Sequence, residues 1–268
     1  MPRRVVHFLL HVPKCAGTTV EEHFRAALGE GFLLAPRWRN PLRGVVGNRY
    51  SMAPGDPRLG SVKVITGHSM GVSLKRRFPG VEIRESVLLR DPVGYHLSLY
   101  DYRVARHRAG AGPKPPGFAS WYLAQRRNPI SRFILNHYYE QGVPALYRLS
   151  SQGRLAWLEE RFAAFWFVGG YRRAGEMIAG ISRELGVAGE AEDRNVGEAS
   201  ETTLDDRMRG RIVSENAVDQ ALWERWAGRG WKADGKNPAE PPPALPGNDR
   251  LRYLASDIAT LFWRVATR

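Results

Sequence analysis

A lysine-led turn between a buried strand and a helix is the first place where this sequence offers chemistry. The apolar run VVHFLLHV, residues 5–12, leads directly into PKCAGTT, and helical spacing begins at Gly17. A helix start leaves backbone N–H groups without partners, and the helix dipole favours negative charge there. The turn places one cation beside small residues and hydroxyl groups: Lys14, Cys15, Ala16, Gly17, Thr18 and Thr19. These features predict an anion site, with a capped, empty turn as the alternative.

The position of this lysine separates the turn from the nucleotide triphosphatase loop. That motif reads Gly-x4-Gly-Lys-Ser/Thr and carries its lysine at the end. Here Lys14 comes first and no Gly-Lys pair follows, so the prediction of an ATP-dependent kinase loses its main support. The chain has only six lysines among 40 basic residues, which suggests that a compact, flexible ammonium group is wanted at this position.

A second group of polar residues follows a later apolar run. In ESVLLRDPVGYHLSLY, Arg90 stands at the carboxyl end of a predicted strand, where open α/β sheets bind ligands. Pro92 is suited to the first turn of a helix, Asp91 to its cap, and Ser98 lies about two turns along. Arg90 and Ser98 are therefore candidates for binding a phosphate group. The alternative is an ion-paired arginine and a solvated serine.

The alternation of apolar and amphipathic segments predicts a three-layer α/β fold, with a mostly parallel sheet and helices on both faces. Strands are predicted over 5–12, 62–66, 86–90 and 165–169. Helices are predicted from residues 17 and 92 and over 118–125, 130–141, 155–164, 171–185 and 204–227. Residues 36–59 and 109–117 are predicted to be loops. We expect a domain over residues 1–231, a Pro-rich linker over 232–247 and a C-terminal helix over 248–268, which docks on the domain or makes a homo-oligomer contact.

Composition points to an anionic partner. The 268 residues include 40 Lys and Arg against 27 Asp and Glu, a formal net charge of +13. Basic residues gather in two segments that we expect to border the acceptor cleft, and they suggest either an acidic acceptor or, as is more usual, a solvated charged surface: Arg37, Arg39, Arg43, Arg49, Lys75, Arg76 and Arg77. A single cysteine, no transmembrane segment of the expected ~18 apolar residues and a first apolar run that reads as a strand predict a cytoplasmic protein.

HVPKCAGTT followed by LLRDPVGYHLSLY resembles the sulfotransferases that use 3′-phosphoadenosine 5′-phosphosulfate (PAPS). The likeness is closest to the carbohydrate O-sulfotransferase branch that includes heparan sulfate 2-O-sulfotransferase and its bacterial relatives. It implies that residues 14–19 hold the 5′-phosphosulfate and that Arg90 and Ser98 hold the 3′-phosphate. FVGGYRRAGEMI resembles a family segment near the adenosine, where Tyr171 could stack on the base or equally pack in the core. The chain departs from the family at Tyr95, where relatives usually carry a basic residue.

The resemblance also implies a general base, because the acceptor hydroxyl loses a proton as it attacks sulfur. Related carbohydrate sulfotransferases place a catalytic histidine after the second strand, and here His68 follows the run VKVIT. His11 is the competitor, although we expect it to pack against the lysine-led turn, and Glu22 and Glu85 are outside candidates. Lys14 is expected to be catalytic as well, by stabilising negative charge on the leaving bridging oxygen. No metal is expected.

We therefore expect a PAPS-dependent O-sulfotransferase that acts on a hydroxylated small molecule or saccharide. Three alternatives stay open at this point. They are a nucleotide or sugar kinase, a degenerate family member that binds PAPS without catalysis, and a nucleic-acid-binding protein. The last lacks a helix-turn-helix, zinc-finger or RNA-recognition signature, so no nucleic-acid partner is expected.

Overall fold

The computed structural model describes residues 3–35, 53, 55–141, 148–189, 202–227, 231–232 and 245. Its centre is a six-stranded sheet in the order β2-β3-β1-β4-β5-β6. The strands are β1 (Val5–Leu10), β2 (Phe32–Leu34), β3 (Val64–Gly67), β4 (Glu82–Leu89), β5 (Phe167–Gly170) and β6 (Trp231–Lys232). All neighbouring pairs are parallel except β5 with β6, which are antiparallel. The predicted α/β class with a mostly parallel sheet is confirmed.

Strand β1 is apolar over most of its length because it is covered on both faces, as central parallel strands are. From Val6 to Leu10 every residue is buried. Its partners keep a common register, with Leu10 opposite Gly67 of β3 and opposite Val87 of β4. The chain runs from β1 toward β2 and β3 on one side and returns to β4 on the other. The strand order therefore reverses at β1, and ligands of open α/β sheets bind at such a point.

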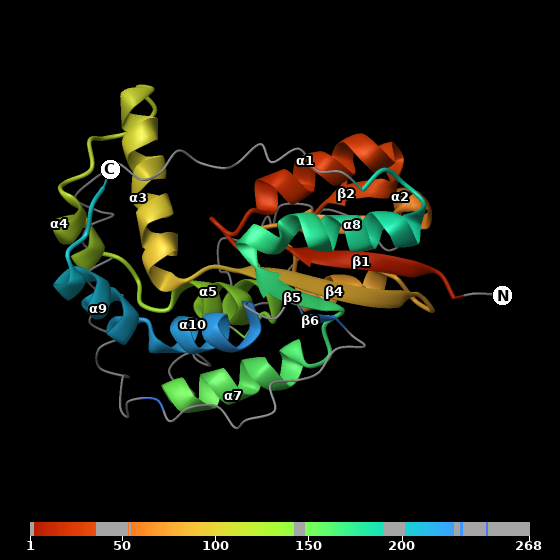
Figure 1. The fold of residues 1–268 in the computed structure, drawn as a ribbon. Coiled ribbons are helices and arrows are strands. Elements are labelled where there is room, and N and C mark those ends of the chain that lie inside the picture. Colours follow the sequence, from red (N-terminus) through yellow and green to blue (C-terminus); the bar gives the residue numbers. More distant parts are fainter. Residues whose placement is uncertain are drawn as a thin grey trace.

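Helices cover both faces of the sheet (Figure 1). On one face α1 (Gly17–Leu28) lies beside α8 (Ala174–Leu185), and on the other lie α5 (Pro129–Phe133), α7 (Ser151–Phe162) and α10 (Ala217–Leu222). The short helix α2 (Arg58–Ser61) precedes β3. Helical turns of the 3-10 type span Gly29–Gly31, Val72–Arg77 and Tyr171–Arg173. This arrangement gives the expected three layers.

Helix α3 (Pro92–Arg108) stands away from the sheet, with α4 (Phe118–Leu123) and α9 (Asp206–Glu215) packed against it (Figure 1). Its start matches the prediction, because Pro92 occupies the first turn and the Asp91 side chain accepts a hydrogen bond from Gly94 N at 2.6 Å. A second apolar cluster joins the three helices: Phe118, Trp121, Tyr122 and Ile212 are buried in it, with Val93 and Leu97 of α3 against them. Helix α3 is thus held as a wall beside the carboxyl edge of the sheet.

The prediction of one helix over 204–227 is wrong. The chain breaks at Asn216 (φ −121°, ψ 40°) into α9 and α10, and a π-helical turn, Trp223–Ala227, follows. The Asn216 amide explains the break, since its Nδ2 donates to the Ile212 carbonyl at 2.7 Å and to the Tyr122 hydroxyl at 3.0 Å. Its Oδ1 accepts from Asn128 N at 2.7 Å. The predicted helix over 130–141 likewise divides, into α5 and a π-helical turn at Ile134–Tyr138.

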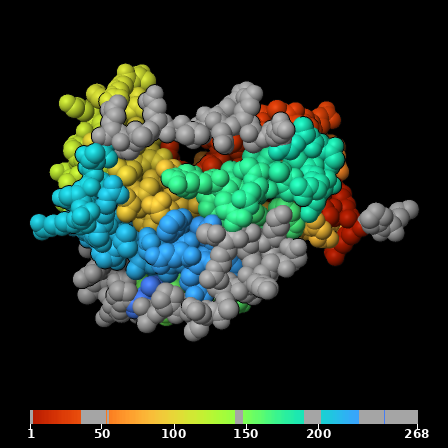
Figure 2. Space-filling model, in the orientation of Figure 1, coloured from red at the N-terminus to blue at the C-terminus, as the bar shows by residue number. Residues whose placement is uncertain are grey.

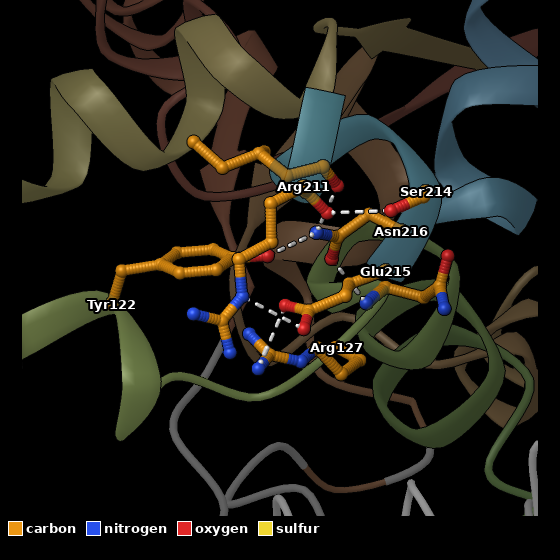
Figure 3. Close-up of polar contacts among 8 residues, drawn as sticks. Tyr122, Arg127, Arg211, Ser214, Glu215 and Asn216 are labelled. Carbon is orange, nitrogen blue, oxygen red and sulfur yellow. Dashed lines mark hydrogen bonds and ion pairs between the residues drawn. The ribbon is translucent and has the colours of Figure 1, made fainter. Parts of the chain in front are cut away.

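Around this break a polar junction ties two distant segments together (Figure 3). Arg127 and Arg211 both bind the Glu215 carboxylate, at 2.8 Å and 3.0 Å. Nearby, Asp219 accepts the backbone N–H groups of Ile130 and Ser131, each at 2.8 Å, and so satisfies the start of α5. The junction fixes α9 and α10 against the segment that carries α4 and α5.

Several predictions fall on residues that lie outside the described part of the chain. These are most of the loop over 36–59, nearly all of the linker over 232–247 and the C-terminal helix over 248–268. The predicted loop over 109–117 is confirmed. Among the described residues, no helix has both the length and the apolar character that crossing a membrane requires.

Candidate functional site

The carboxyl edge of the sheet collects the side chains that the sequence singled out. The turn with Lys14 follows β1, His68 follows β3, Arg90 follows β4 and Tyr171 follows β5. The strands are in parallel register, so their ends meet at one edge. In the space-filling view the surface is hollowed between α3 and the pair α1 and α8, above this edge (Figure 2).

The β1–α1 turn has an unusual backbone for residues other than glycine. Lys14 and Ala16 adopt left-handed conformations, with φ of 63° and 61°. Ala16 precedes α1, and no side chain caps the helix start. Thr18 and Thr19 lie inside the first turn of α1, so neither of them caps it. The first turn also holds no acidic residue, so its N–H groups and dipole are available to an anion.

Glycine is required at position 17 because any side chain there would collide with the neighbouring His11 ring. A Cβ at this position would lie 1.9 Å from Cδ2 of His11 and 2.3 Å from its Nε2. The His11 ring thus packs directly on the start of α1. It is buried, and its Nδ1 lies 3.5 Å from the carboxylate of Glu21, one turn further along the helix. Burial, reinforced by the nearby His68, lowers the pKa of His11 to about 3, so this ring is neutral.

Arg90 joins the two predicted anion-binding segments. Its Nη1 donates to the Lys14 carbonyl at 3.1 Å, and its guanidinium lies 4.2 Å from the ring centroid of Tyr171. Its Nε is buried and has no hydrogen-bond partner within the described part of the chain. A buried N–H of a cation without an acceptor is costly, and an anion would satisfy it.

Lys14 lies close to this guanidinium. Desolvation lowers the pKa of the Lys14 ammonium, the positive charge of Arg90 lowers it further, and Asp101 opposes both effects. The ammonium lies 4.7 Å from the ring centroid of Tyr102 on α3. Two cations from different strands are thereby held together beside an uncapped helix start. This arrangement favours a bound anion with more than one charge.

His68 has the geometry of a base. Its Nδ1 lies 2.7 Å from the His11 carbonyl, which can only accept a hydrogen bond. In the neutral ring the hydrogen is therefore on Nδ1, and Nε2 keeps its lone pair. The ring centroid of His68 lies 3.9 Å from that of His11, so His68 sits next to the start of α1. The side chain is exposed, as contact with an acceptor requires.

The remaining candidates differ in how well they fit. Arg90 lies over one face of the Tyr171 ring, and the Tyr171 hydroxyl accepts from Arg172 Nε at 3.1 Å, so Tyr171 positions Arg90. Ser98 lies two turns into α3 and makes no polar contact among the described residues. Burial raises the pKa of the Cys15 thiol, so only the backbone of this residue suits an anion.

Among the other base candidates, Glu85 is already bound by Lys75 at 2.8 Å and by the Tyr138 hydroxyl. This pairing also occupies Lys75, which was expected at the acceptor cleft. Glu22 is exposed on α1. Tyr95, the departure from the family pattern, is buried in the core and supplies no charge.

One feature of the site escaped the sequence reasoning. Tyr102 carries no motif, yet its ring contacts Lys14 from α3. The expected packing of His11 against the turn is confirmed, with Gly17 as its contact. For Tyr102 the one available signal is helical spacing, since it lies two turns beyond Tyr95 and one turn beyond Ser98. Within the described residues no group of three His, Cys, Asp or Glu side chains could hold a metal ion.

No protein-family model and no curated protein matches this sequence. Among solved structures, the chain is similar to the crystal structure of mouse sulfotransferase SULT7A1 complexed with PAP. The two share 11% sequence identity with a TM-score of 0.35, and the match covers 94% of this chain and 75% of the mouse chain. A likeness at this level assigns neither an activity nor a branch of a family. The functional conclusion therefore depends on the geometry of the site.

Proposed function

We propose that this protein is a sulfotransferase that moves the sulfuryl group of PAPS to a hydroxyl group of an acceptor. One observation carries the proposal. Arg90 reaches from β4 to the Lys14 carbonyl in the β1–α1 turn, with a buried Nε that lacks an acceptor among the described residues. The two segments that the motifs assign to the 3′-phosphate and the 5′-phosphosulfate are thus adjacent, as one nucleotide with two anionic ends requires.

The residues present fit such a donor. The uncapped start of α1 presents N–H groups to the 5′ end, and Lys14 adds a positive charge there. The Arg90 guanidinium, held by Tyr171 and by the turn, is suited to the 3′-phosphate, with the Ser98 hydroxyl as a second candidate ligand. PAPS supplies the activated sulfuryl group, and the chain binds it and orients it.

Within this scheme His68 takes the proton of the acceptor hydroxyl. The His11 carbonyl holds the Nδ1 hydrogen, so the free Nε2 faces the proton to be removed. The neighbouring His11 ring is neutral because it is buried. Its closeness to His68 disfavours a positive charge on His11 further. Lys14 stabilises the negative charge that develops on the bridging oxygen as 3′,5′-ADP leaves. A carbohydrate acceptor remains part of this proposal, on the motif resemblance alone.

The test is transfer of labelled sulfate from PAPS to a panel of phenolic and saccharide hydroxyls, with His68→Ala and Lys14→Ala as variants. We expect transfer to at least one acceptor. Loss of a general base typically costs about 10²–10⁴ in rate, with donor binding retained in the His68 variant. His23→Ala is the matched control, because the polar contact of His23 is with the Ser182 hydroxyl of α8, 3.2 Å from its Nε2. Binding of 3′,5′-ADP without any transfer would instead indicate a PAPS-binding protein without catalysis.

A further inference from the structure

A basic pocket lies beside the outer end of α3, one helical turn beyond Tyr102. It is lined by Arg103 and Arg106 of the helix and by residues 111–115 of the loop that follows. Its cations are Arg103, Arg106 and Lys114, and none of them forms an ion pair with a described residue. The pocket is small, with a cavity volume of about 90 Å³.

Hydrogen bonds fix the loop that lines the pocket against α3. The chain leaves α3 through Gly110, whose φ is 68°, and Ala111 N donates back to the Arg106 carbonyl at 2.8 Å. Arg106 Nη2 in turn donates to the Ala111 carbonyl at 2.6 Å. At the far end of the loop, the Tyr100 hydroxyl donates to the Pro116 carbonyl at 3.0 Å. These bonds hold the loop wall against the helix.

One aromatic ring connects the pocket to the proposed reaction centre. The Lys14 ammonium lies 4.7 Å from the ring centroid of Tyr102, and the Arg106 guanidinium lies 6.0 Å from the same centroid. The ring is 45% exposed, which leaves it available for a ligand to pack on. A molecule lying on Tyr102 would therefore have the transferring group at one end and the cations of the pocket at the other.

From this juxtaposition we propose that the pocket is an acceptor subsite, which binds a carboxylate or sulfate ester carried on the acceptor while the acceptor's ring packs on Tyr102. The inference rests on the proposed function, since it takes Lys14 to mark the reaction centre. Arg103 and Lys114 supply the selectivity for the anion. Arg106 also donates to the Ala111 carbonyl and so holds the end of α3 and the loop together, and for this reason the test does not replace it.

The test titrates the full chain, with and without saturating 3′,5′-ADP, with two pairs of probes at low salt. One pair is methyl β-D-glucuronide and methyl β-D-glucoside, and the other is 4-hydroxyphenylacetate and 4-hydroxyphenylacetamide. We expect the anionic member of at least one pair to bind about tenfold more tightly, as one charged hydrogen bond would give. The pair that shows the preference identifies which ring the site accepts.

The double variant Arg103→Gln with Lys114→Gln is expected to lose this preference while 3′,5′-ADP binding stays unchanged. Arg183→Gln is the control, because Arg183 is an exposed arginine in the last turn of α8. Equal binding within both pairs, no binding by either anionic probe, or a preference that survives the double variant would overturn the inference. Failure of 3′,5′-ADP to bind would count against the proposed function alone, since the probes are also titrated without it.

Discussion

Replacing Gly17 by alanine tests whether the start of α1 is shaped by the contact with His11. The new Cβ would lie 1.9 Å from Cδ2 of His11, about half of an ordinary contact distance between carbon atoms. The His11 ring has little room to retreat, because it is only 8% exposed and lies against His68 at 3.9 Å. Either the ring or the turn must therefore move by more than 1 Å, on the order of a bond length.

The size of the effect follows from two opposing contributions. Overpacking of this kind costs about 1–3 kcal/mol. Removing a glycine from a helix returns about 0.5–1 kcal/mol, although this gain is smaller in the first turn. We expect the free energy of unfolding to fall by roughly 1–2 kcal/mol and the melting temperature to fall by about 2–8 °C. Affinity for 3′,5′-ADP should fall as well, since the displaced groups include the N–H groups that bind the anion.

The assay is urea denaturation followed by a 3′,5′-ADP titration on the same preparations. Gly210→Ala is the matched control, because Gly210 lies in the exposed interior of α9 and a Cβ there meets nothing within 4 Å. That variant should be stabilised by about 0.5–1 kcal/mol and bind 3′,5′-ADP normally. If Gly17→Ala matched Gly210→Ala in both measurements, the packing argument would be wrong.

Three further predictions concern stability and reactivity. Burial, the largest cause in each case, lowers the pKa of His7 to about 4 and those of His11 and His96 to about 3. Below pH 6.5 the unfolded chain binds protons on these histidines and the folded chain does not, so the free energy of unfolding falls as the pH falls. Burial raises the pKa of Asp219 to about 6, and protonation of this carboxyl in the folded chain offsets part of the loss. Urea denaturation should show that the free energy of unfolding falls by about 4 kcal/mol from pH 7 to pH 5, and an unchanged midpoint would contradict this. Asn216→Ala leaves the buried N–H of Asn128 without its acceptor and should lower the free energy of unfolding by about 2–4 kcal/mol. Ser214→Ala, on the exposed side of α9, is the control and should lower it by less than about 1 kcal/mol. Equal losses would refute the role of the junction. The buried Cys15 thiol should react with a maleimide only as fast as the native protein opens, and labelling within seconds at pH 8 would show that the turn is open.

The sequence predicts where Lys14 and Arg90 lie in the fold better than it predicts the helices around them. Lys14 and Arg90 follow strands whose apolar runs are distinct, and parallel strands bring their carboxyl ends together whatever the loops between them do. The break at Asn216 was not predictable, because it depends on Asn128 and Tyr122, about 90 positions earlier in the chain. Local periodicity alone favours an unbroken helix there.

The edge strands escaped prediction for a related reason. Strand β2 is three residues long and β6 is two, and each is defined by its neighbour in the sheet rather than by a run of its own. The stacking of Arg90 on Tyr171 was hidden in the same way, since it needs the adjacency of β4 and β5. Sequence reasoning left Tyr171 open between stacking on a base and packing in the core, and the structure places the Arg90 guanidinium over its ring.

The most direct measurement compares 3′,5′-ADP with 5′-AMP by calorimetry, on the native protein and on Arg90→Gln. The two nucleotides differ only in the 3′-phosphate, so the ratio of their dissociation constants isolates the contribution of the second anion. We expect the native protein to prefer 3′,5′-ADP by at least about tenfold, as one charged hydrogen bond would give, and the Arg90 variant to bind both alike. Equal binding by the native protein, or a preference that survives loss of the guanidinium, would contradict the account.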